Sequence, residues 1–336
     1  MLGLLVLGEA TFGVPLLAQV TAPKHTIDSR VVLVVGHKNP DTDAILSALG
    51  LASLLRLQGR AAQSIAQGKP NPETAWVLQR CGLVAPPVQT VVNGHPVMLV
   101  DHSDAELAPE GLSPENLIGI VDHHKLGGLT SHAPLLVRVE PVGSTATVLV
   151  DMFQAAQQPI EAPLACGLLA AVLSDTRSFT SPTTTAADRE AATLLARSAG
   201  IKNPLAMGQA MLEVYAKAMA RLDDHALLNT DFKRFRFGQL NVGIAQVESS
   251  DIGFVLQRRQ SLLEAMEQQR QRNQLHTLVL LATDVPRQGS ELFVASAEPQ
   301  RVAALFGVTL QQHSAWVPGL MSRKRQVVPV LEQGLR

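Results

Sequence analysis

The sequence predicts an α/β protein, with a doubly wound, mainly parallel sheet in an N-terminal domain followed by a smaller α/β domain. Three observations predict this fold class. Short aliphatic and β-branched runs alternate with segments whose apolar residues recur at helical spacing, as in βαβ units. Three of the runs end at Asp or His side chains, where open α/β sheets place their ligands. Beyond residue 230, strand-like runs become more frequent, which indicates a second domain.

Length and composition support two globular units. The chain has 336 residues, which indicates about two domains, and its 46% hydrophobic and 17% charged residues suffice for a sizeable core. We divide it into an extension over 1–30, a first domain over 31–215 and a second over 222–336, with the boundary between Tyr215 and Asp224. A formal charge of −1 gives no general basic surface, so we expect no broad affinity for nucleic acid or for an anionic membrane.

The first thirty residues are apolar and allow three interpretations: a cleaved signal, a loosely ordered extension, or an over-called start codon. No Lys or Arg precedes Lys24, and Glu9 and Pro15 interrupt the run, which disfavours the signal. Cys81 and Cys166 are far apart and lack CxxC spacing. We therefore expect free thiols, no disulfide framework, no membrane span and a cytoplasmic protein.

The first strand and helix flank a polar turn. Residues 31–35 read as a buried strand, Gly36 ends it, and a helix is expected from Asp43 to Leu57. Between them lie His37, Asp41 and Asp43, an imidazole and two carboxylates. These side chains are either metal ligands or, for the two Asp residues, caps of the following helix.

The remaining elements of the first domain repeat this arrangement. Strands are expected at Val97–Val100, Leu117–Val121 and Leu135–Val139, and helices at Pro72–Arg80, 144–154, Pro163–Leu173, Thr184–Ala196 and Pro204–Leu228. Asp101 follows the first of these strands, and Asp122-His123-His124 follows the second. Asp175 follows a helix. Because parallel strands end at one edge of a sheet, these side chains are expected to converge.

The converging side chains form a candidate metal site. Four clustered Asp residues repel one another unless cations neutralise them, and mixed Asp and His ligation suits Mn²⁺, Co²⁺, Zn²⁺ or Fe²⁺ better than Ca²⁺. A shared carboxylate can hold two ions. Taken singly, each residue has a structural alternative, a helix cap or a hydrogen-bonded histidine, but their joint occurrence favours metal. The candidate ligands are His37, Asp41, Asp43, Asp101, His123 and Asp175, whereas His102 and His132 are interpreted as solvated or structural.

The second domain is expected to contain strands and two helices, with a basic run near its end. The strands are at Lys233–Phe237, Leu240–Val247, Leu275–Leu281 and Leu292–Ala295, and the helices at Ile252–Arg272 and Pro299–Phe306. The run Ser322-Arg323-Lys324-Arg325 follows a Pro-Gly turn. It is either a solvated charge run or a phosphate clamp, which Lys233 would join.

Six segments together resemble one protein family. In chain order they are GHKNPDTDA, NPETAWVL, VDHHKLGGL, EPVGSTATVL, SDTRSFTSPTTT and SRKRQVVP, from Val31 to the C-terminus. They resemble the manganese-dependent (family II) inorganic pyrophosphatases of the DHH phosphoesterase superfamily. Each motif alone is shared with DHH relatives, but SRKRQVVP with the NPDTD form of the first motif is specific to pyrophosphatases. Arg325 and the stretch Thr176-Arg177-Ser178 depart from the family pattern.

The resemblance implies a role for each candidate residue. His37 and Asp41 would hold one metal ion and Asp43, His123 and Asp175 the other, with Asp101 bridging them. The active site would lie in the cleft between the domains. His124 would interact with the substrate near the leaving group, and the substrate-binding cations would be Lys233, Arg323 and Lys324.

The activity implied is hydrolysis of inorganic pyrophosphate to two phosphates by a hydroxide held between two Mn²⁺ or Co²⁺ ions, with additional Mg²⁺ accompanying the substrate. A homodimer through the N-terminal domains is also implied. One alternative is a DHH phosphoesterase acting on polyphosphate, short oligonucleotides or cyclic dinucleotides. The absence of a Gly-Gly-Gly-His motif and an aromatic content of 4% disfavour base stacking. The other is a catalytically silent phosphate-sensing module, disfavoured by the full set of ligand types.

Overall fold

The first domain is built on a parallel sheet, as predicted. The computed structural model describes residues 31–335, so the extension expected over 1–30 lies outside the described residues. The strands are β1 (Val32–Val35), β2 (Ala62–Ile65), β3 (Val97–Val100), β4 (Leu117–Asp122) and β5 (Leu136–Val139). Their order is β2-β1-β3-β4-β5 and every neighbouring pair is parallel. The sequence analysis missed β2, because its Gln and Ser residues break the apolar pattern.

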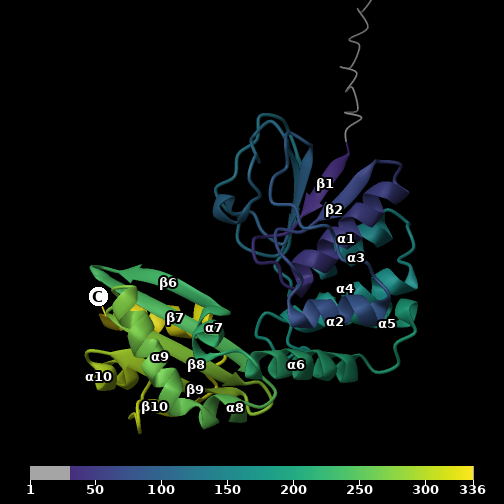
Figure 1. The fold of residues 1–336 in the computed structure, drawn as a ribbon. Helices are drawn as coiled ribbons and strands as arrows, with labels where there is room; N and C mark the ends of the chain where they lie inside the picture. The colour runs from purple at the N-terminus through teal and green to yellow at the C-terminus, as the bar shows by residue number, and fades with distance from the viewer. Residues whose placement is uncertain (1–30, 336) are drawn as a thin grey trace, which may run out of the picture.

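A layer of helices lies below the labelled strands β1 and β2 in Figure 1. They are α1 (Thr42–Leu57), α2 (Pro72–Cys81), α3 (Thr145–Ala155), α4 (Ala162–Asp175) and α5 (Ala186–Ala199). Helices α1 and α3 contact the strands, and α4 packs against both of them. Val32 and Val34 face this helical core, whereas Leu33 and Val35 face a smaller cluster formed with the segments between β2 and β5. The strands are therefore buried on both faces, which explains their uninterrupted apolar sequences.

The close approach of β1 and α1 depends on Gly36. A Cβ atom at this position would lie 2.7 Å from the Ala44 Cβ and 2.8 Å from the Ala44 carbonyl oxygen. Real Cβ atoms do not approach other heavy atoms this closely, so a side chain here would push the helix away from the strand. The glycine thus lets the polar turn between β1 and α1 sit directly on the sheet edge.

Helix α6 (Pro204–Ala220) connects the two sheets. It contacts α2 and α4 on one side and β7 (Leu240–Ser249) of the second sheet on the other. The single helical stretch predicted from 204 to 228 is wrong, because Asp223 accepts a hydrogen bond from the Ala226 amide and starts a separate helix, α7 (Asp224–Asn229). The predicted boundary between Tyr215 and Asp224 falls at the end of α6.

The second sheet is mixed and is covered on both faces. It adds β6 (Phe232–Phe237), β8 (Thr277–Asp284), β9 (Gly289–Ser296) and β10 (Ser314–Pro318) to β7, in the order β10-β9-β8-β7-β6. Among the described strands of this sheet, only the pair β7 and β8 is parallel. One face packs against α7, α8 (Gly253–Gln257) and α9 (Arg259–Arg272), and the other against α10 (Pro299–Ala304) and α11 (Val328–Leu335).

Two expectations for this domain are corrected. The helix predicted over 252–272 is interrupted at Arg258, whose backbone (φ −101°, ψ 16°) is not helical. β10, α11 and the π-helical segment η2 (Arg323–Val327) were not predicted. The basic run therefore lies in an unusual helical turn that leads directly into α11.

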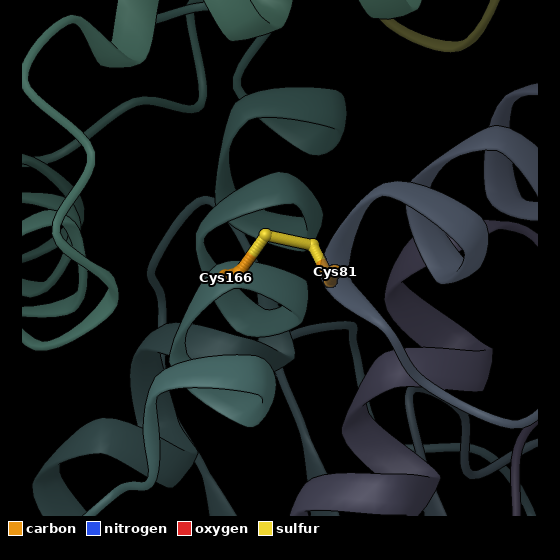
Figure 2. Close-up of a disulfide and its surroundings, with 2 residues drawn as sticks. All are labelled: Cys81 and Cys166. Carbon is orange, nitrogen blue, oxygen red and sulfur yellow. A yellow bond between two sulfur atoms is a disulfide. The ribbon is translucent and has the colours of Figure 1, made fainter.

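The expectation of free thiols is wrong. Cys81, the last residue of α2, forms a disulfide with Cys166 of α4 across 85 residues of sequence, with Cα atoms 5.6 Å apart (Figure 2). Sequence separation does not report this proximity, because α2 and α4 pack side by side. The cysteines therefore give no support to a cytoplasmic location. Within residues 31–335, no helix is long and apolar enough to cross a bilayer.

Candidate metal centre

The turn between β1 and α1 both caps the helix and carries candidate ligands. Asp41 is the N-cap of α1 and accepts a hydrogen bond from the Ala44 amide at 2.9 Å. Asp43 is fully buried and accepts from the Thr145 amide at 2.6 Å and the Ala146 amide at 3.1 Å. These amides belong to the start of α3, whose positive dipole end favours a carboxylate. The capping alternative is thus confirmed for Asp41, and Asp43 is fixed by a second helix.

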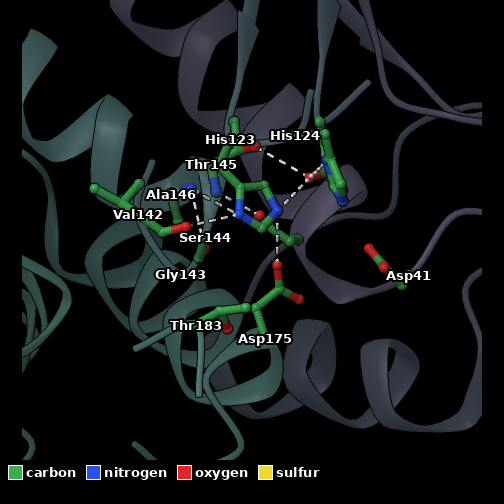
Figure 3. A network of polar contacts seen from close by, with 12 residues as sticks. Asp41, His123, His124, Val142, Gly143, Ser144, Thr145, Ala146, Asp175 and Thr183 are labelled. Carbon is green, nitrogen blue, oxygen red and sulfur yellow. Dashed lines mark hydrogen bonds and ion pairs between the residues drawn. The ribbon is translucent and has the colours of Figure 1, made fainter. Parts of the chain in front are cut away.

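Other elements bring further candidate ligands to the same edge. Asp101 follows β3, is 1% exposed and has a left-handed backbone conformation (φ 64°). Such a conformation is uncommon outside glycine and is often found at functional positions. His123 follows β4, and Asp175 is the last residue of α4. Figure 3 shows His123 pointing toward Asp175, with Asp41 nearby.

Asp101 lies between two groups of side chains. Its Oδ2 is 3.4 Å from His37 Nε2, and its Oδ1 is 3.4 Å from His123 Nε2. His37 Nε2 is also 3.5 Å from Asp41 Oδ2, and His123 Nε2 is 3.3 Å from Asp175 Oδ2. The potential ligand atoms lie within 4.8 Å of one another in each of three overlapping groups, all of which contain Asp101. Two of them hold the predicted ligands, with His37, Asp41 and Asp101 on one side and Asp43, Asp101, His123 and Asp175 on the other, and the third is Asp101, His123 and His124. The structure therefore brings all six predicted ligands together, with one carboxylate common to all three groups.

The imidazoles are oriented as metal ligands would be. His123 Nδ1 is 3.1 Å from the Val142 carbonyl oxygen, and His37 Nδ1 is 2.9 Å from the Lys38 carbonyl oxygen. If each Nδ1–H donates to its carbonyl, each Nε2 carries the lone pair that a metal needs. His123 Nε2 is buried and has no hydrogen-bond partner within the described residues. A buried, unpartnered acceptor facing two carboxylates fits a divalent cation.

The pKa values of the site also fit a divalent cation. Burial and the neighbouring Asp101 carboxylate raise the pKa of Asp43 to about 7, and burial with the charge of Asp43 raises the pKa of Asp175 well above its usual range. For both imidazoles burial lowers the pKa, but the interaction with Asp101 outweighs it. The pKa of His37 rises to about 11 and that of His123 to about 9. Without metal, the site therefore retains protons that divalent cations would displace.

His124 lies at the rim of this group. Its side chain is 41% exposed, and its Nδ1 is 2.9 Å from Asp122 Oδ1. Asp122 is fully buried and also accepts the backbone amides of His123 at 2.8 Å and His124 at 3.0 Å. Because Asp122 holds Nδ1, Nε2 is the nitrogen that remains for a bound molecule. The tripeptide thus places both histidines beside Asp101, with His124 Nδ1 3.7 Å from Asp101 Oδ1 and the His124 side chain the more exposed of the two.

The two histidines interpreted as solvated or structural have separate environments. His102 is 2% exposed, its Nδ1 is 2.9 Å from the Val100 carbonyl oxygen, and its Nε2 has no hydrogen-bond partner within the described residues. His132 is exposed, and its Nδ1 is 3.2 Å from Glu115 Oε1. Neither residue belongs to a ligand group within the described chain.

The predicted cations form a group of their own in the second domain. Arg323 donates to the carbonyl oxygen of Asp231 at 2.7 Å and forms an ion pair with its carboxylate at 2.9 Å. Partial burial and then the charge of Arg323 lower the pKa of the otherwise solvent-exposed Lys233, Asp231 opposes this effect, and Lys324 lowers the pKa further. These charges act on one another although β6 and η2 are far apart in sequence. The phosphate clamp stays a prediction.

A residue that the sequence analysis did not interpret as functional links the two groups. Arg177, two residues after Asp175, forms an ion pair with Glu248 of β7 and donates to the Met321 carbonyl oxygen at 2.9 Å. Met321 lies two residues before Arg323. The only signal in the sequence was the departure from the family pattern at Arg177. Arg177 therefore connects the loop that follows the candidate ligand Asp175 to the loop that precedes Arg323.

Two family models match the chain. The DHH family, N-terminal domain, matches residues 31–174, and the DHHA2 domain matches residues 209–333. The first range contains the sheet edge with five of the six candidate ligands, and the second contains the cationic group. The two matches therefore correspond to the two sheets.

Relatives and solved structures match over nearly their whole length. A manganese-dependent inorganic pyrophosphatase of Methanocaldococcus jannaschii is 38% identical over 308 residues, covering 89% of this chain and 98% of the relative. A protein of Archaeoglobus fulgidus named probable manganese-dependent inorganic pyrophosphatase is 37% identical over 316 residues, with 90% and 98% coverage. A crystal structure from Methanococcus jannaschii, assigned as a family II inorganic pyrophosphatase, has a TM-score of 0.75 at 36% identity and covers 90% of this chain and 99% of that one.

Proposed function

This chain belongs to the manganese-dependent inorganic pyrophosphatases of the DHH family, and we propose that it hydrolyses pyrophosphate to two phosphates at the metal centre described above. The observation that carries the proposal is the position of Asp101. One buried carboxylate lies between two groups of Asp and His ligands, which is the arrangement that a pair of divalent ions needs.

The ligands divide into two sets in this proposal. His37 and Asp41 would hold one ion, Asp43, His123 and Asp175 would hold the other, and Asp101 would serve both. The two ions would be Mn²⁺ or Co²⁺, and further Mg²⁺ would accompany the substrate. When bound, such ions act as Lewis acids and lower the pKa of water enough to make it a nucleophile near neutral pH. The four carboxylates would formally balance the charge of two divalent ions, and the two neutral imidazoles would add no charge.

The other residues act on the phosphates. Arg323, Lys324 and Lys233 neutralise the phosphoryl oxygens, whose charge is redistributed during in-line transfer. The ion pair with Asp231 holds the Arg323 guanidinium in place before substrate binds. His124, fixed through Nδ1 by Asp122, presents Nε2 to the oxygen of the departing phosphate. Positioning and charge neutralisation supply the rate, and no covalent intermediate is needed.

We also propose a homodimer formed through the first domain. β5 is the edge strand of the parallel sheet, and its Leu136 and Val137 are 49% and 51% exposed. Exposed apolar residues on an unpaired strand edge are rarely left uncovered in stable proteins. Light scattering of the intact protein tests this, and Val137→Lys should shift the mass toward the monomer. A wild-type mass equal to that of one chain would refute it.

A phosphate-release assay separates the activities open to this family. Pyrophosphate, tripolyphosphate and a dinucleotide are offered to the protein with Mn²⁺, Co²⁺ or Mg²⁺ as the only divalent ion. We expect rapid release from pyrophosphate with Mn²⁺ or Co²⁺, and much slower release from the other two substrates. Preferential cleavage of the dinucleotide or of tripolyphosphate would indicate a different DHH phosphoesterase, and no release from any substrate would indicate a binding module.

A further inference from the structure

The start of α2 contains a motif to which the proposed mechanism gives no role. In the segment NPETAWVL, Asn71 caps the helix by accepting from the Thr74 amide at 2.8 Å and the Thr74 hydroxyl at 3.0 Å. Pro72 occupies the first turn, where its missing N–H costs nothing. This cap determines the direction of the next side chain, Glu73, which extends toward α1 and α4.

One oxygen of Glu73 joins two segments of the metal centre. Oε1 accepts a hydrogen bond from the Thr42 hydroxyl at 2.7 Å and another from the Ser174 hydroxyl at 2.6 Å. Thr42 lies between Asp41 and Asp43, and Ser174 directly precedes Asp175. The fully buried Thr42 hydroxyl is also 2.9 Å from that of Thr74. A single carboxylate oxygen therefore connects the backbone segments that supply three of the six ligands.

An ionised carboxylate at this partly buried position is energetically unfavourable. Burial raises the pKa of Glu73, the two hydroxyls oppose this effect, and the charge of Asp41 raises the pKa further. The site thus accepts an additional acidic group beside four Asp residues that already repel one another. Hydroxyl donors paired only with each other would avoid this repulsion. What the Glu73 side chain adds is one oxygen that accepts both donors at one point.

We infer that Glu73 is a positioning residue, which sets the separation between the Asp41–Asp43 turn and Asp175 and so tunes the affinity of the centre for manganese. This inference depends on the proposed metal centre. Outer partners that orient metal ligands typically contribute about 10–100-fold in metal affinity or activity. Glu73 acts on both sides of the centre, because the turn supplies ligands to both ion sites and Asp175 to one of them.

Two measurements on the metal-stripped protein test the inference. Titration calorimetry gives its affinity for manganese, and thermal unfolding gives its melting temperature with and without Mn²⁺. Glu73→Ala should weaken manganese binding about 10–100-fold and reduce the rise in melting temperature that Mn²⁺ produces, while the metal-free melting temperature changes little. Glu73→Gln keeps an oxygen that accepts both hydroxyls and should restore affinity to within about 3-fold of wild type. Glu190→Ala, at an exposed Glu of α5, is the matched control and should leave both values unchanged.

The outcomes are distinct. Wild-type manganese affinity in Glu73→Ala would overturn the inference, and so would equal loss in the Gln and Ala variants, since the charge itself would then be what matters. If Glu73→Ala does not fold, Ser174→Ala removes one of the two donors and should still weaken binding several-fold. Because binding is measured without substrate, wild-type protein that binds Mn²⁺ but releases no phosphate would refute the proposed activity and leave this test intact.

Discussion

The acidic edge of the first sheet and the cationic end of the second are assembled in different ways. In the first, the ends of strands and helices place Asp43 and Asp101 in almost complete burial, where like charges are held close together. In the second, Lys233 and Lys324 are exposed, and Arg323 is held by hydrogen bonds to the Asp231 carbonyl oxygen and, through its amide, to Gln246. Buried carboxylates need a permanent counter-charge, whereas exposed cations can remain solvated until an anion arrives. The difference predicts that metal is resident and phosphate is transient.

The largest effect should follow removal of the carboxylate shared by the two ligand groups. Asp101→Ala should reduce kcat by about 10³-fold or more, since one electrostatic group at a reacting centre commonly contributes 10²–10³-fold and this one serves both ion sites. Turnover at saturating Mn²⁺ and the manganese content after gel filtration are measured together. Near-normal turnover in metal-replete buffer would show that the acidic edge is not the reacting centre.

A smaller effect is expected at the rim, between the two regions. His124→Gln should lower kcat by about 10²-fold, the usual range for a group that handles a proton, while the manganese content stays at the wild-type value. The structure motivates this expectation, because His124 Nδ1 is held by Asp122 and the ring is partly exposed. Loss of bound manganese in the variant would instead indicate that His124 is a metal ligand.

In the cationic group, a single substitution should act mainly on binding. Lys324→Ala should raise KM by about 10-fold, the equivalent of one charge-assisted contact to phosphate, with kcat changed only a few-fold. Lys69→Ala, at a lysine of the first domain outside the cationic group, is the control. If KM and kcat are both unchanged at Lys324→Ala, the basic run is a solvated surface and the comparison between the two regions fails.

The same difference explains which residues the sequence predicted well. His37, Asp101 and His123 each follow a short apolar run, and parallel strands that end at one edge must bring such residues together. The joint pattern was therefore readable without a structure, and so was the cap at Asp41. The cationic group was less accessible, because β6 and η2 meet through tertiary packing, and neither η2 nor β10 has a periodic sequence pattern. There, family resemblance supplied what local sequence did not.

Contacts between elements were the main failure of the sequence analysis. The breaks at Asp223 and Arg258 were missed because helical periodicity continues across them, and only the cap or the backbone angles reveal the interruption. The ion pair of Arg177 with Glu248 joins the two domains across 71 residues. The pairing of Cys81 with Cys166 depends in the same way on which helices are neighbours. No residue type or local spacing encodes these partners.

Removal of the disulfide should have the smallest effect on catalysis of the changes proposed here. It should lower the stability of the first domain without lowering its activity. The disulfide joins the end of α2 to α4, while Glu73 and Ser174 join the opposite ends of the same two helices beside Asp175. Replacing both cysteines by serine should lower the free energy of unfolding by about 2–4 kcal/mol, because the closed loop is long. Activity with Mn²⁺ should stay within about 2-fold of wild type, since the hydrogen bonds of Glu73 hold the end near the ligands.

Denaturant unfolding and steady-state rates measure both quantities in one preparation. Neither of the chain's two cysteines lies in the second domain, whereas Trp316 lies there, in β10. The denaturant concentration at which Trp316 becomes exposed therefore reports whether the loss of stability is confined to the first domain. If the cysteine variant loses activity as strongly as Glu73→Ala, the two ends of the α2–α4 pair move together. The acidic edge would then depend on the whole helical layer beneath it rather than on the hydrogen bonds next to its ligands.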